Sequence, residues 1–460
     1  MTATLNTHRY FPRSTALASV VLGLVLSAFM ILPPTAVAEE PPKKLLVVTV
    51  TKGFRHSSIP TAEAVIGSLA ERHDRFSVDF ARTDEALAEK MSPERLSAYD
   101  GVIFANTTGE LPLPDKEAFV AWIRSGKGFV GMHSATDTFH QFRPYIDMIG
   151  GEFQTHGPQV EVHVFNDDPA HAACKHYGSH FRVFDEIYIL KSFHRERVHG
   201  LLTLGHHPNT LIPGDYPIAW SKQYGEGRVF YTSLGHREDI WTSKDYQDHI
   251  LGGILWSVGL AEGSAEPRDL GYEVAAEEAE LGFKPLFNGK DLAGWRLRNP
   301  DGKASWSAQN GVLVNALAKG EHGTDLVSED SFWNFSVRFE YQVPKGSNSG
   351  FYLRGRHEIQ ILEDAGQRKL SPGGNGAIYS LKPVDVFVSR RAGEWQEVEA
   401  TIRDHRVTVY LNGVKVHDQV EVTKATGGEL DAKIDEPGPI LLQGDHGAVA
   451  FRNLRLRVLE

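Results

Sequence analysis

The stretch SNSGFYLRGRHEIQILED, residues 347–364, sets the expected fold of the C-terminal half because its side chains alternate in character. Successive side chains of a β-strand point to opposite faces, so a strand over 350–362 separates the two kinds of residue. The apolar set is Phe351, Leu353, Ile359 and Ile361, and the polar set is Arg354, Arg356, Glu358 and Gln360. The pattern predicts one buried face and one face that carries charge.

The charged face has two interpretations. A solvated surface is the simpler one, but strands protect exposed edges with lysine rather than with glutamate beside glutamine. Arginine offers a planar pair of donors and glutamate offers a base, which are the groups that a sugar site needs. We therefore expect this face to form a site around which the rest of the chain is organised.

Length and composition limit the remaining choices. The chain has 460 residues, more than one hydrophobic core usually serves, so two domains are expected. Hydrophobic residues make up 41% and charged residues 23%, as in a soluble globular protein. The formal net charge is -11 and no basic tract occurs, so nucleic acid is not an expected partner. Cys174 is the one cysteine, which rules out a disulfide within the chain.

The first 38 residues have the features of a secretory signal peptide. Basic residues come first, at His8, Arg9 and Arg13. An apolar run over 16–32 leads to Ala36-Val37-Ala38, an A-x-A cleavage site, and no cysteine nearby would carry a lipid. An uncleaved anchor is the alternative, although the run is short. We expect a periplasmic or secreted protein with no integral membrane domain after signal removal.

Residues 43–260 alternate between strand-like apolar runs and helix-like stretches. Strands are expected over 45–51, 76–80, 101–105, 128–132 and 229–233, and helices over 60–71 and 114–125. Such alternation predicts an α/β domain with a parallel sheet. Ligands of these sheets bind at the carboxyl ends of the strands.

Several histidines fall at those strand ends. His56 follows the first strand, His133 and Asp137 follow the fourth, and His236 follows the strand at 229–233, while His156 and Glu186 lie in intervening segments. A single histidine is more often structural, but several at strand ends predict a site that grips sugar hydroxyls or binds a divalent metal. No pair has the H-x-x-x-H spacing of a helical zinc site, so the spacing adds no support for a metal.

Residues 43–260 also resemble the trehalose-utilisation (ThuA-like) family. The matching stretches are TKGFRHSS (51–58), GFVGMHSATDT (128–138), PIAW (217–220), GRVFYTSLGH (227–236) and HILGGILW (249–256). The resemblance implies the flavodoxin-like fold of class I glutamine amidotransferases and a role in sugar metabolism, with oxidised (3-keto) disaccharides as expected substrates.

One departure from the amidotransferases has a chemical consequence. Their nucleophilic cysteine lies in a G-x-C-x-G turn, whereas this chain has Gly131-Met132-His133-Ser134-Ala135 there, and Cys174 is remote in sequence. Without a thiolate at the turn, glutamine hydrolysis by that mechanism is not available. Sugar binding or a vestigial role therefore competes with catalysis as the task of this domain.

An acidic linker is expected over 261–281, interrupted by Pro267 and Gly271, with a turn of helix over 275–280.

In residues 282–460 the apolar and polar side chains alternate with a period of two, and turns are frequent. Strands are expected over 306–314, 336–343, 350–362, 394–403, 407–411, 415–422, 440–443 and 449–459. Asn412-Gly413 between two of them is a strong hairpin signal. Many short strands without a sustained helix predict an all-β domain, a β-sandwich or jelly roll.

Motifs in this second domain resemble the 3-keto-disaccharide hydrolase domain family. They are FKPLFNGKDLAGW (283–295), NSGFYLRG (348–355), EIQILED (358–364), GAIY (376–379) and GPILLQGDHG (438–447). The resemblance implies a concanavalin- or laminarinase-like jelly roll that attacks glycosides already oxidised at C3.

The implied chemistry needs one base and one positive group. A ketone at C3 acidifies the C2 proton, so a base removes it, a positive group holds the enolate, and the C1 substituent leaves before water adds. The carboxylate pair of ordinary glycosidases is not required. We assign Glu358 as the base and Arg354 as the enolate partner, with His446 as a further catalytic candidate.

Other residues complete the expected sites. The substrate-binding candidates are Asn348, Gln360, Tyr379, Asp364 and Gln443 in the second domain, and His56, His133, Asp137 and His236 in the first. The sequence establishes no cofactor, and a divalent metal is an alternative to Arg354 as the electrophile. The metal-ligand candidates are Glu358, His446, His133, His156 and Glu186.

Two functions of different classes remain open. In the first, the protein is a hydrolase or lyase of 3-keto-glycosides or 3-keto-disaccharides. In the second, the β-sandwich is a carbohydrate-binding module attached to a ThuA-like domain that does whatever catalysis exists. Binding modules usually present exposed aromatic platforms, whereas the face described above is rich in charge, which favours the enzyme. A small carbohydrate is the expected partner in both cases.

Overall fold

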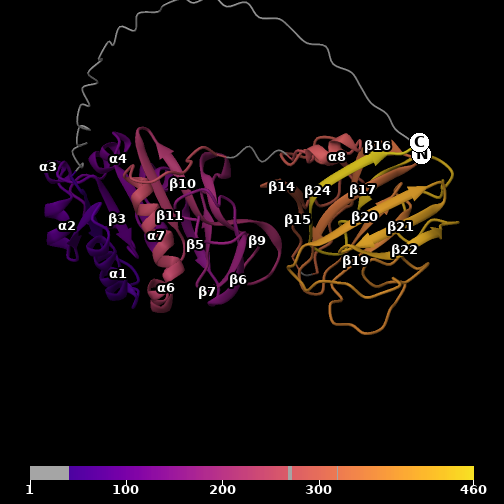
Figure 1. Ribbon diagram of the computed structural model, residues 1–460, viewed down its shortest axis with the longest axis horizontal. Helices are drawn as coiled ribbons and strands as arrows, with labels where there is room; N and C mark the ends of the chain where they lie inside the picture. Colours follow the sequence, from indigo (N-terminus) through magenta and orange to yellow (C-terminus); the bar gives the residue numbers. More distant parts are fainter. Residues whose placement is uncertain (1–40, 268–271, 319) are drawn as a thin grey trace, which may run out of the picture. The chain divides into compact units, whose positions relative to one another are not determined.

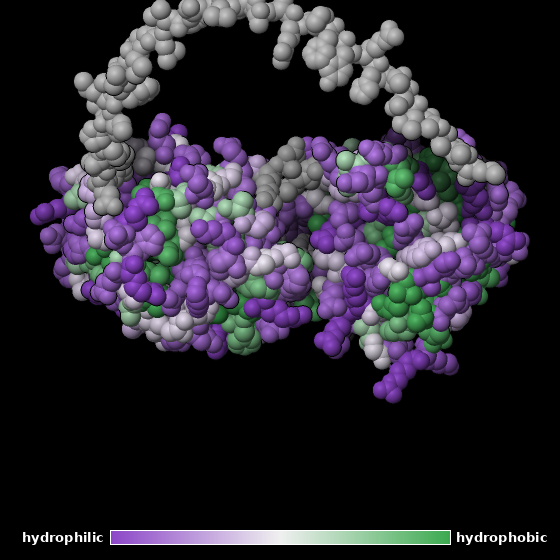
Figure 2. Space-filling view, viewed as in Figure 1, coloured by the Kyte–Doolittle hydropathy of each residue, from purple (hydrophilic) through white to green (hydrophobic). Residues whose placement is uncertain are grey.

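The computed structural model describes residues 41–267, 272–318 and 320–460, which form an α/β domain and an all-β domain (Figure 1). The expected signal peptide, residues 1–38, lies outside the described residues, as do residues 268–271 of the expected linker. No helix in the described ranges is long and apolar enough to cross a membrane. The face of the molecule in view is largely hydrophilic (Figure 2).

The α/β domain is built on a nine-stranded sheet. The strands of this domain are β1 (Lys43–Val48), β2 (Phe76–Ala81), β3 (Gly101–Ala105), β4 (Gly128–Met132), β5 (Glu152–His156), β6 (Val160–Asn166), β7 (His180–Asp185), β8 (Tyr188–Lys191), β9 (His199–His206), β10 (Pro213–Tyr224) and β11 (Gly227–Thr232). The order in the sheet is β2-β1-β3-β4-β11-β10-β9-β6-β7, and β5 pairs with β8 separately.

The expected parallel sheet accounts for five of the nine strands. Strands β2, β1, β3, β4 and β11 run parallel, whereas β10, β9, β6 and β7 continue the sheet antiparallel. The parallel strands were predictable because they are short apolar runs buried on both faces. Strand β7 alternates exposed and half-buried side chains, so no apolar run marks it.

Helices cover both faces of the parallel part. They are α1 (Ile59–Arg72), α2 (Asp84–Lys90), α3 (Pro93–Leu96), α4 (Lys116–Arg124), α5 (Arg143–Ile149), α6 (Glu238–Thr242) and α7 (Lys244–Ser257), with 3-10 turns η1 (His133–Asp137) and η2 (Arg195–Arg197). Leu45 and Val47 of β1 pack in a core that includes α1 and α7, whereas Leu46 and Val48 pack in a second core with α4 and α5. This alternation explains the unbroken apolar sequence of β1.

The second domain is a sandwich of two antiparallel sheets, preceded by the short helix α8 (Ala276–Glu280). Its strands are β12 (Lys284–Pro285), β13 (Trp295–Leu297), β14 (Trp306–Gln309), β15 (Val312–Asn315), β16 (Leu326–Phe332), β17 (Phe335–Gln342), β18 (Asn348–Leu353), β19 (His357–Leu362), β20 (Gln396–Arg403), β21 (Arg406–Leu411), β22 (Val414–Glu421), β23 (Gly438–Leu442) and β24 (Val449–Val458). One sheet has the order β14-β15-β24-β17-β20-β21-β22 with β12 beside β24, and the other has β13-β16-β23-β18-β19. Phe339 of β17 stacks on Phe351 of β18 with ring centroids 4.0 Å apart, which joins the two sheets through one core.

The expected single strand over 350–362 is a hairpin. Strands β18 and β19 pair antiparallel around the turn Arg354-Gly355-Arg356, where Arg354 has a φ of 56° and Gly355 a φ of 67°. Phe351 pairs with Ile359 and Tyr352 with Glu358, so cross-strand partners have the same parity. The alternation in sequence therefore still separates an apolar face from a polar one. The expected strand over 306–314 is likewise a hairpin of β14 and β15.

Candidate functional site

Polar side chains of the five-stranded sheet lie on its outer face, which is the face opposite the sandwich core. Phe351, Ile359 and Leu442 point into the core, so their neighbours along each strand point outward. Gly350 pairs with Gln360 of β19, and the Gln443 N–H donates to the Gly350 carbonyl at 2.9 Å. Position 350 is therefore flanked by a glutamine on each side across the sheet.

Glu358 lies on this outer face, and the residue is 3% exposed. A side-chain carbon at Gly350 would collide with Glu358 Oε1, so the carboxyl leans over the glycine. The Glu358 N–H donates to Thr426 Oγ1 at 2.9 Å, and the Tyr352 hydroxyl oxygen lies 2.9 Å from the Gly427 carbonyl oxygen. The segment that begins at Thr426 thereby covers part of the face and holds Glu358 in place.

The pKa of Glu358 is raised to about 8. Burial is the main cause, and the negative charges of Asp325 and Asp445 raise the pKa further. A hydrogen bond with the Tyr352 side chain opposes them and lowers the pKa. A carboxyl with a pKa near neutrality transfers protons more effectively than an ordinary glutamate, which makes Glu358 a candidate general base.

Unpaired amide oxygens lie on the same outer face of the sheet as this carboxyl. Gln360 Oε1, Gln443 Oε1 and Asn348 Oδ1 are buried and have no hydrogen-bond partner. Buried polar atoms are nearly always paired, so three unpaired acceptors on one face indicate a place for the hydroxyl groups of a ligand. The ring of Tyr379 lies beside Gly427. The backbone N–H of Tyr379 donates to the backbone carbonyl of Glu358 at 3.0 Å. The structure thus places four of the expected residues on or beside the face that carries Glu358.

Arg354 does not join them, which corrects the expected pairing of Arg354 with Glu358. Its guanidinium is buried 3.6 Å from the centroid of the Trp333 ring, and Nε donates to the Trp333 carbonyl at 2.7 Å. Arg356 pairs with Asp431 at 2.6 Å. Because residues 354–356 form the hairpin turn, both arginines brace neighbouring loops. Asp364 is also structural, since its Oδ2 accepts the Asn375 N–H at 2.9 Å.

His446 is connected to Glu358 only indirectly, through its neighbour Asp445. The Nδ1–H of His446 donates to Asp445 Oδ1, and Asp445 is one of the carboxylates that act on Glu358. About half of the His446 side chain is exposed to solvent. Neither His446 nor Glu358 belongs to a group of three or more metal-ligating side chains among the described residues.

Tyr352 and Asp325 belong to the site but were not predicted. Tyr352 lies within the stretch 347–364 and has the same parity as Glu358, so its register could have identified it. Asp325 directly precedes β16, a strand that the sequence pattern did not predict, and its Oδ1 accepts the Gly444 N–H at 2.9 Å.

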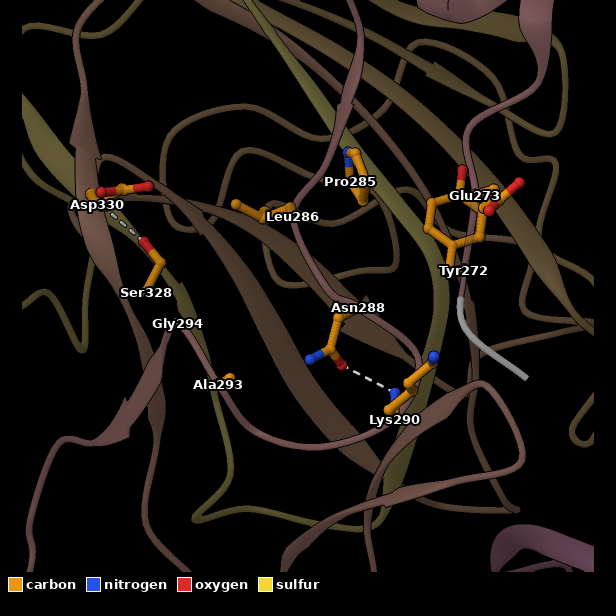
Figure 3. A pocket seen from close by; sticks show the side chains of 10 residues that line it. All are labelled: Tyr272, Glu273, Pro285, Leu286, Asn288, Lys290, Ala293, Gly294, Ser328 and Asp330. Atoms are coloured by element: carbon orange, nitrogen blue, oxygen red, sulfur yellow. Dashed lines mark hydrogen bonds between the residues drawn. The ribbon is translucent and has the colours of Figure 1, made fainter. Parts of the chain in front are cut away.

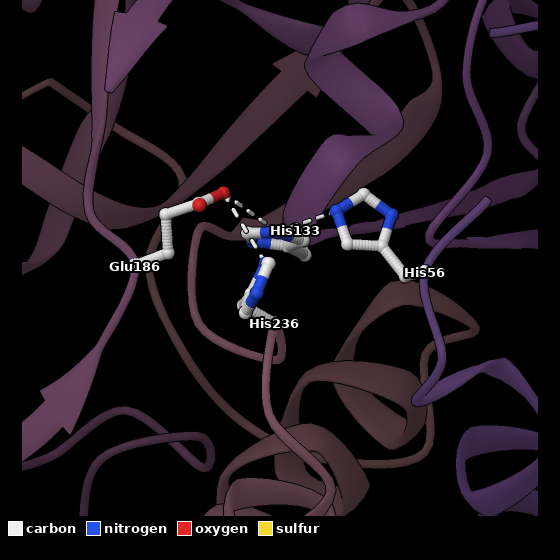
Figure 4. A group of neighbouring side chains, drawn as sticks. All are labelled: His56, His133, Glu186 and His236. Carbon is white, nitrogen blue, oxygen red and sulfur yellow. Dashed lines mark hydrogen bonds and ion pairs between the residues drawn. The ribbon is translucent and has the colours of Figure 1, made fainter. Parts of the chain in front are cut away.

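The α/β domain gathers a second group of side chains (Figure 4). His56, His133, His236 and Glu186 each offer one ligand atom, and these atoms all lie within 4.8 Å of one another. His56 Nε2 is 3.2 Å from His133 Nε2, and His236 Nδ1 is 3.2 Å from Glu186 Oε1. Asp137 lies outside this group and pairs with His140 at 2.7 Å.

Burial keeps two of these imidazoles neutral. Burial and the neighbouring His236 together lower the pKa of His56 to about 4. Burial also lowers the pKa of His133 well below its ordinary value. The adjacent Glu186 carboxylate instead raises the pKa of His236. Neutral imidazoles next to a carboxylate form a donor set that could hold a metal ion.

A cavity of about 800 Å³ lies elsewhere in the all-β domain (Figure 3). Its lining includes Tyr272, Leu286, Asn288, Lys290 and Asp330. None of the expected site residues lines it, so we assign it no part in the chemistry.

Comparison with known proteins divides the chain in two. Residues 44–257 match the family model ThuA, described as trehalose utilisation. Residues 282–457 match the family model described as a 3-keto-alpha-glucoside-1,2-lyase-like domain. A 3-keto-disaccharide hydrolase of Bacteroides thetaiotaomicron is 26% identical over 265 residues, which cover 43% of this chain and 89% of that protein.

Solved structures are also similar to parts of the chain. A protein of Parabacteroides distasonis assigned as a glycosyl hydrolase is 27% identical with a TM-score of 0.33, covering 39% of this chain and 84% of its own. A ThuA-like protein of Parabacteroides merdae is 20% identical with a TM-score of 0.41, covering 50% of this chain and 94% of its own.

Proposed function

We propose that this chain, which joins a ThuA-like domain to a 3-keto-disaccharide hydrolase-like domain, is a carbohydrate-active enzyme that cleaves 3-keto-glycosides. The similarity to a named 3-keto-disaccharide hydrolase supports the substrate class. The observation that carries the proposal is the buried Glu358 carboxyl, whose pKa is raised to about 8, on a face with unpaired amide oxygens.

In the proposed reaction, Glu358 removes the proton at C2 of the oxidised sugar. The C–H electrons form an enolate with the C3 ketone, and the enolate then expels the C1 oxygen substituent as the C1–O bond breaks. The proton that Glu358 took passes to the departing oxygen, which leaves a 1,2-unsaturated 3-ketone. Water adds across that double bond, so elimination followed by hydration amounts to hydrolysis.

His446 is the proposed positive partner in place of Arg354. Asp445 accepts the Nδ1–H of His446, which orients the ring, and an imidazolium ring carries its second proton on Nε2. A proton on Nε2 would then be available to the enolate oxygen as negative charge develops there. The exposure of His446 is consistent with a group that meets a substrate entering from solvent.

The unpaired amides supply specificity in this proposal. Hydroxyl groups of the sugar donate to the side-chain oxygens of Gln360, Gln443 and Asn348, which would otherwise stay buried without partners. The ring of Tyr379 offers an apolar surface at the edge of the same face. A substrate that lacks these hydroxyls would leave the acceptors unpaired and bind weakly.

We further propose that the protein acts in the periplasm or outside the cell, after removal of residues 1–38 at the A-x-A site. The proposed domains are 43–260, with the fold of class I glutamine amidotransferases, and 282–460, with a jelly-roll fold. The β2-β1-β3-β4 order of the parallel strands supports the first of these assignments.

The test is incubation of the purified protein with a 3-keto-glucoside that carries a chromogenic aglycone, followed by mass analysis of the sugar product. Release of the aglycone with an unsaturated ketone or its hydrated form is the expected result. Binding of the sugar without release of the aglycone would contradict the enzyme and support a carbohydrate-binding module.

A further inference from the structure

We propose that the α/β domain contains a metal centre, in which His56, His133, His236 and Glu186 bind one divalent first-row transition-metal ion. The four residues come from four separate segments of the chain. His56, His133 and His236 follow strands β1, β4 and β11, which are parallel, and Glu186 lies between β7 and β8. Figure 4 shows their side chains converging on one point.

The hydrogen bonds behind the cluster orient its donor atoms inward. His133 Nδ1 is 2.8 Å from the Ser233 carbonyl, which only accepts, so Nδ1 carries the ring proton. The lone pair of His133 is therefore on Nε2, the atom that faces His56 Nε2. Metal-binding histidines are typically held this way, with the distal nitrogen donating to a backbone carbonyl.

The two carboxylate oxygens of Glu186 have different neighbours, one inside the cluster and one outside it. Its Oε2 is 3.1 Å from His156 Nδ1, while Oε1 lies 3.2 Å from His236 Nδ1 and 3.7 Å from His133 Nε2. His156, itself an expected metal ligand, thus orients the carboxylate from outside the group. One oxygen of Glu186 remains directed at the imidazoles.

The backbone at His133 is strained in a way that serves this arrangement. His133 has a φ of 48°, in the left-handed region, directly at the end of β4. Such a conformation is unfavourable for a non-glycine residue and is found mainly at functional sites. The turn projects a fully buried imidazole into the cluster, at the position where amidotransferases have cysteine.

A hydrogen bond between His56 and His133 would satisfy those two rings but would leave the rest of the cluster unexplained. His236 Nδ1 is buried and makes no well-directed hydrogen bond, although Glu186 Oε1 is close to it. One cation at the centre would accept lone pairs from all four residues and neutralise the carboxylate. Three imidazoles and a carboxylate suit zinc, iron or manganese and do not suit the oxygen-seeking Mg²⁺ or Ca²⁺.

The cluster is open to solvent on one side. The side chain of His236 is 20% exposed and that of His156 is 43% exposed, whereas His133 is fully buried. Water or an oxygen atom of a small ligand therefore has access to an ion bound there. An ion with an exchangeable position acts as a Lewis acid on such an oxygen.

The test is the metal content of the full chain, expressed without a histidine tag and measured by plasma mass spectrometry. About one equivalent of a single transition metal per chain is expected. The double variant His56→Gln/Glu186→Gln should lose it, while His163→Gln, which alters a histidine outside the cluster, should keep it. Added Co²⁺ should give visible d–d absorption with chelator-treated wild type and none with the double variant.

Thermal unfolding keeps the test independent of catalysis in the all-β domain. Chelator should lower the melting temperature of the wild type, and added Zn²⁺ should restore it, with neither change in the double variant. Wild-type protein that contains no transition metal and shows no shift with Zn²⁺ or Co²⁺ would overturn the proposal. Equal metal content in wild type and the double variant would overturn it as well.

Discussion

The carboxyl of Glu358 occupies the space that a side chain at Gly350 would need. A carbon atom added at Gly350 would collide with Glu358 Oε1 and lie 2.9 Å from the ring of Tyr352. The two residues lie on paired strands, so the relationship follows from the register of β18 and β19. The missing side chain at position 350 is therefore what lets the proposed base lie over the sheet.

Gly350→Ala should reduce turnover while leaving the fold intact. The strand conformation at position 350 suits alanine, but the new methyl group meets Glu358 Oε1, the end of a flexible side chain, and the edge of the Tyr352 ring, so both side chains must shift. Displacing the base by about 1 Å is expected to slow turnover roughly 10²-fold. Gly67→Ala in α1, where the nearest atom is 3.9 Å away, is the control. Unchanged turnover by Gly350→Ala would mean that the position of Glu358 is unimportant.

The stability of the all-β domain should fall as pH rises from about 4.5 to about 8. The pKa of Glu358 is raised from 4.5 to about 8, so in this window the folded protein holds a proton that the unfolded chain has lost. Each pH unit then costs up to about 1.4 kcal/mol of unfolding free energy. Urea unfolding across this range should show a steeper decline for wild type than for Glu358→Gln. Parallel curves for the two proteins would show that the carboxyl has an ordinary pKa.

Asp325→Asn should move the acidic limb of the pH–rate profile to lower pH. The negative charge of Asp325 raises the pKa of Glu358. Removing that charge lowers the pKa, so the ionised base is present at lower pH. The asparagine oxygen still accepts the Gly444 N–H. In the profile of kcat/KM against pH, we expect the limb to shift by about one pH unit or less.

Tyr352→Phe is the opposing control for that shift. The hydrogen bond from Tyr352 lowers the pKa of Glu358, so losing the hydroxyl should move the limb to higher pH. Shifts of the same sign in the two variants would contradict the assignment of the limb to Glu358.

The sequence predicts the polar face but not exactly which residues lie on it. The two strands of a hairpin keep the same alternation of apolar and polar residues when paired residues are both odd-numbered or both even-numbered. The alternation alone therefore does not distinguish one long strand from a hairpin. The RGR segment continues the alternation and is therefore predicted to belong to the face, although it forms the turn. Asp325 escapes prediction because sheet neighbours distant in sequence leave no periodic signal. The histidines are predictable because parallel strands deliver their carboxyl ends to one edge.

Arg354→Lys should destabilise the protein without changing the chemistry. Lysine cannot stack a planar group on Trp333 while donating from Nε to its carbonyl, so we expect a loss of about 1–3 kcal/mol. Chemical denaturation measures the loss, and the pH–rate profile of the folded variant should match wild type. A variant with wild-type stability whose turnover is slowed roughly a hundredfold or more would return Arg354 to the role of enolate partner.

Turnover of a 3-keto-glucoside by Glu358→Gln tests the central claim most directly. Glutamine keeps the shape of the side chain but cannot accept the C2 proton, so turnover should slow roughly 10²–10⁴-fold. Glu397→Gln, at a surface glutamate of the same domain whose side chain is 62% exposed, should retain wild-type turnover. Circular dichroism of both variants should match wild type. A folded Glu358→Gln protein with near-normal turnover would contradict the account, because the base would then lie elsewhere.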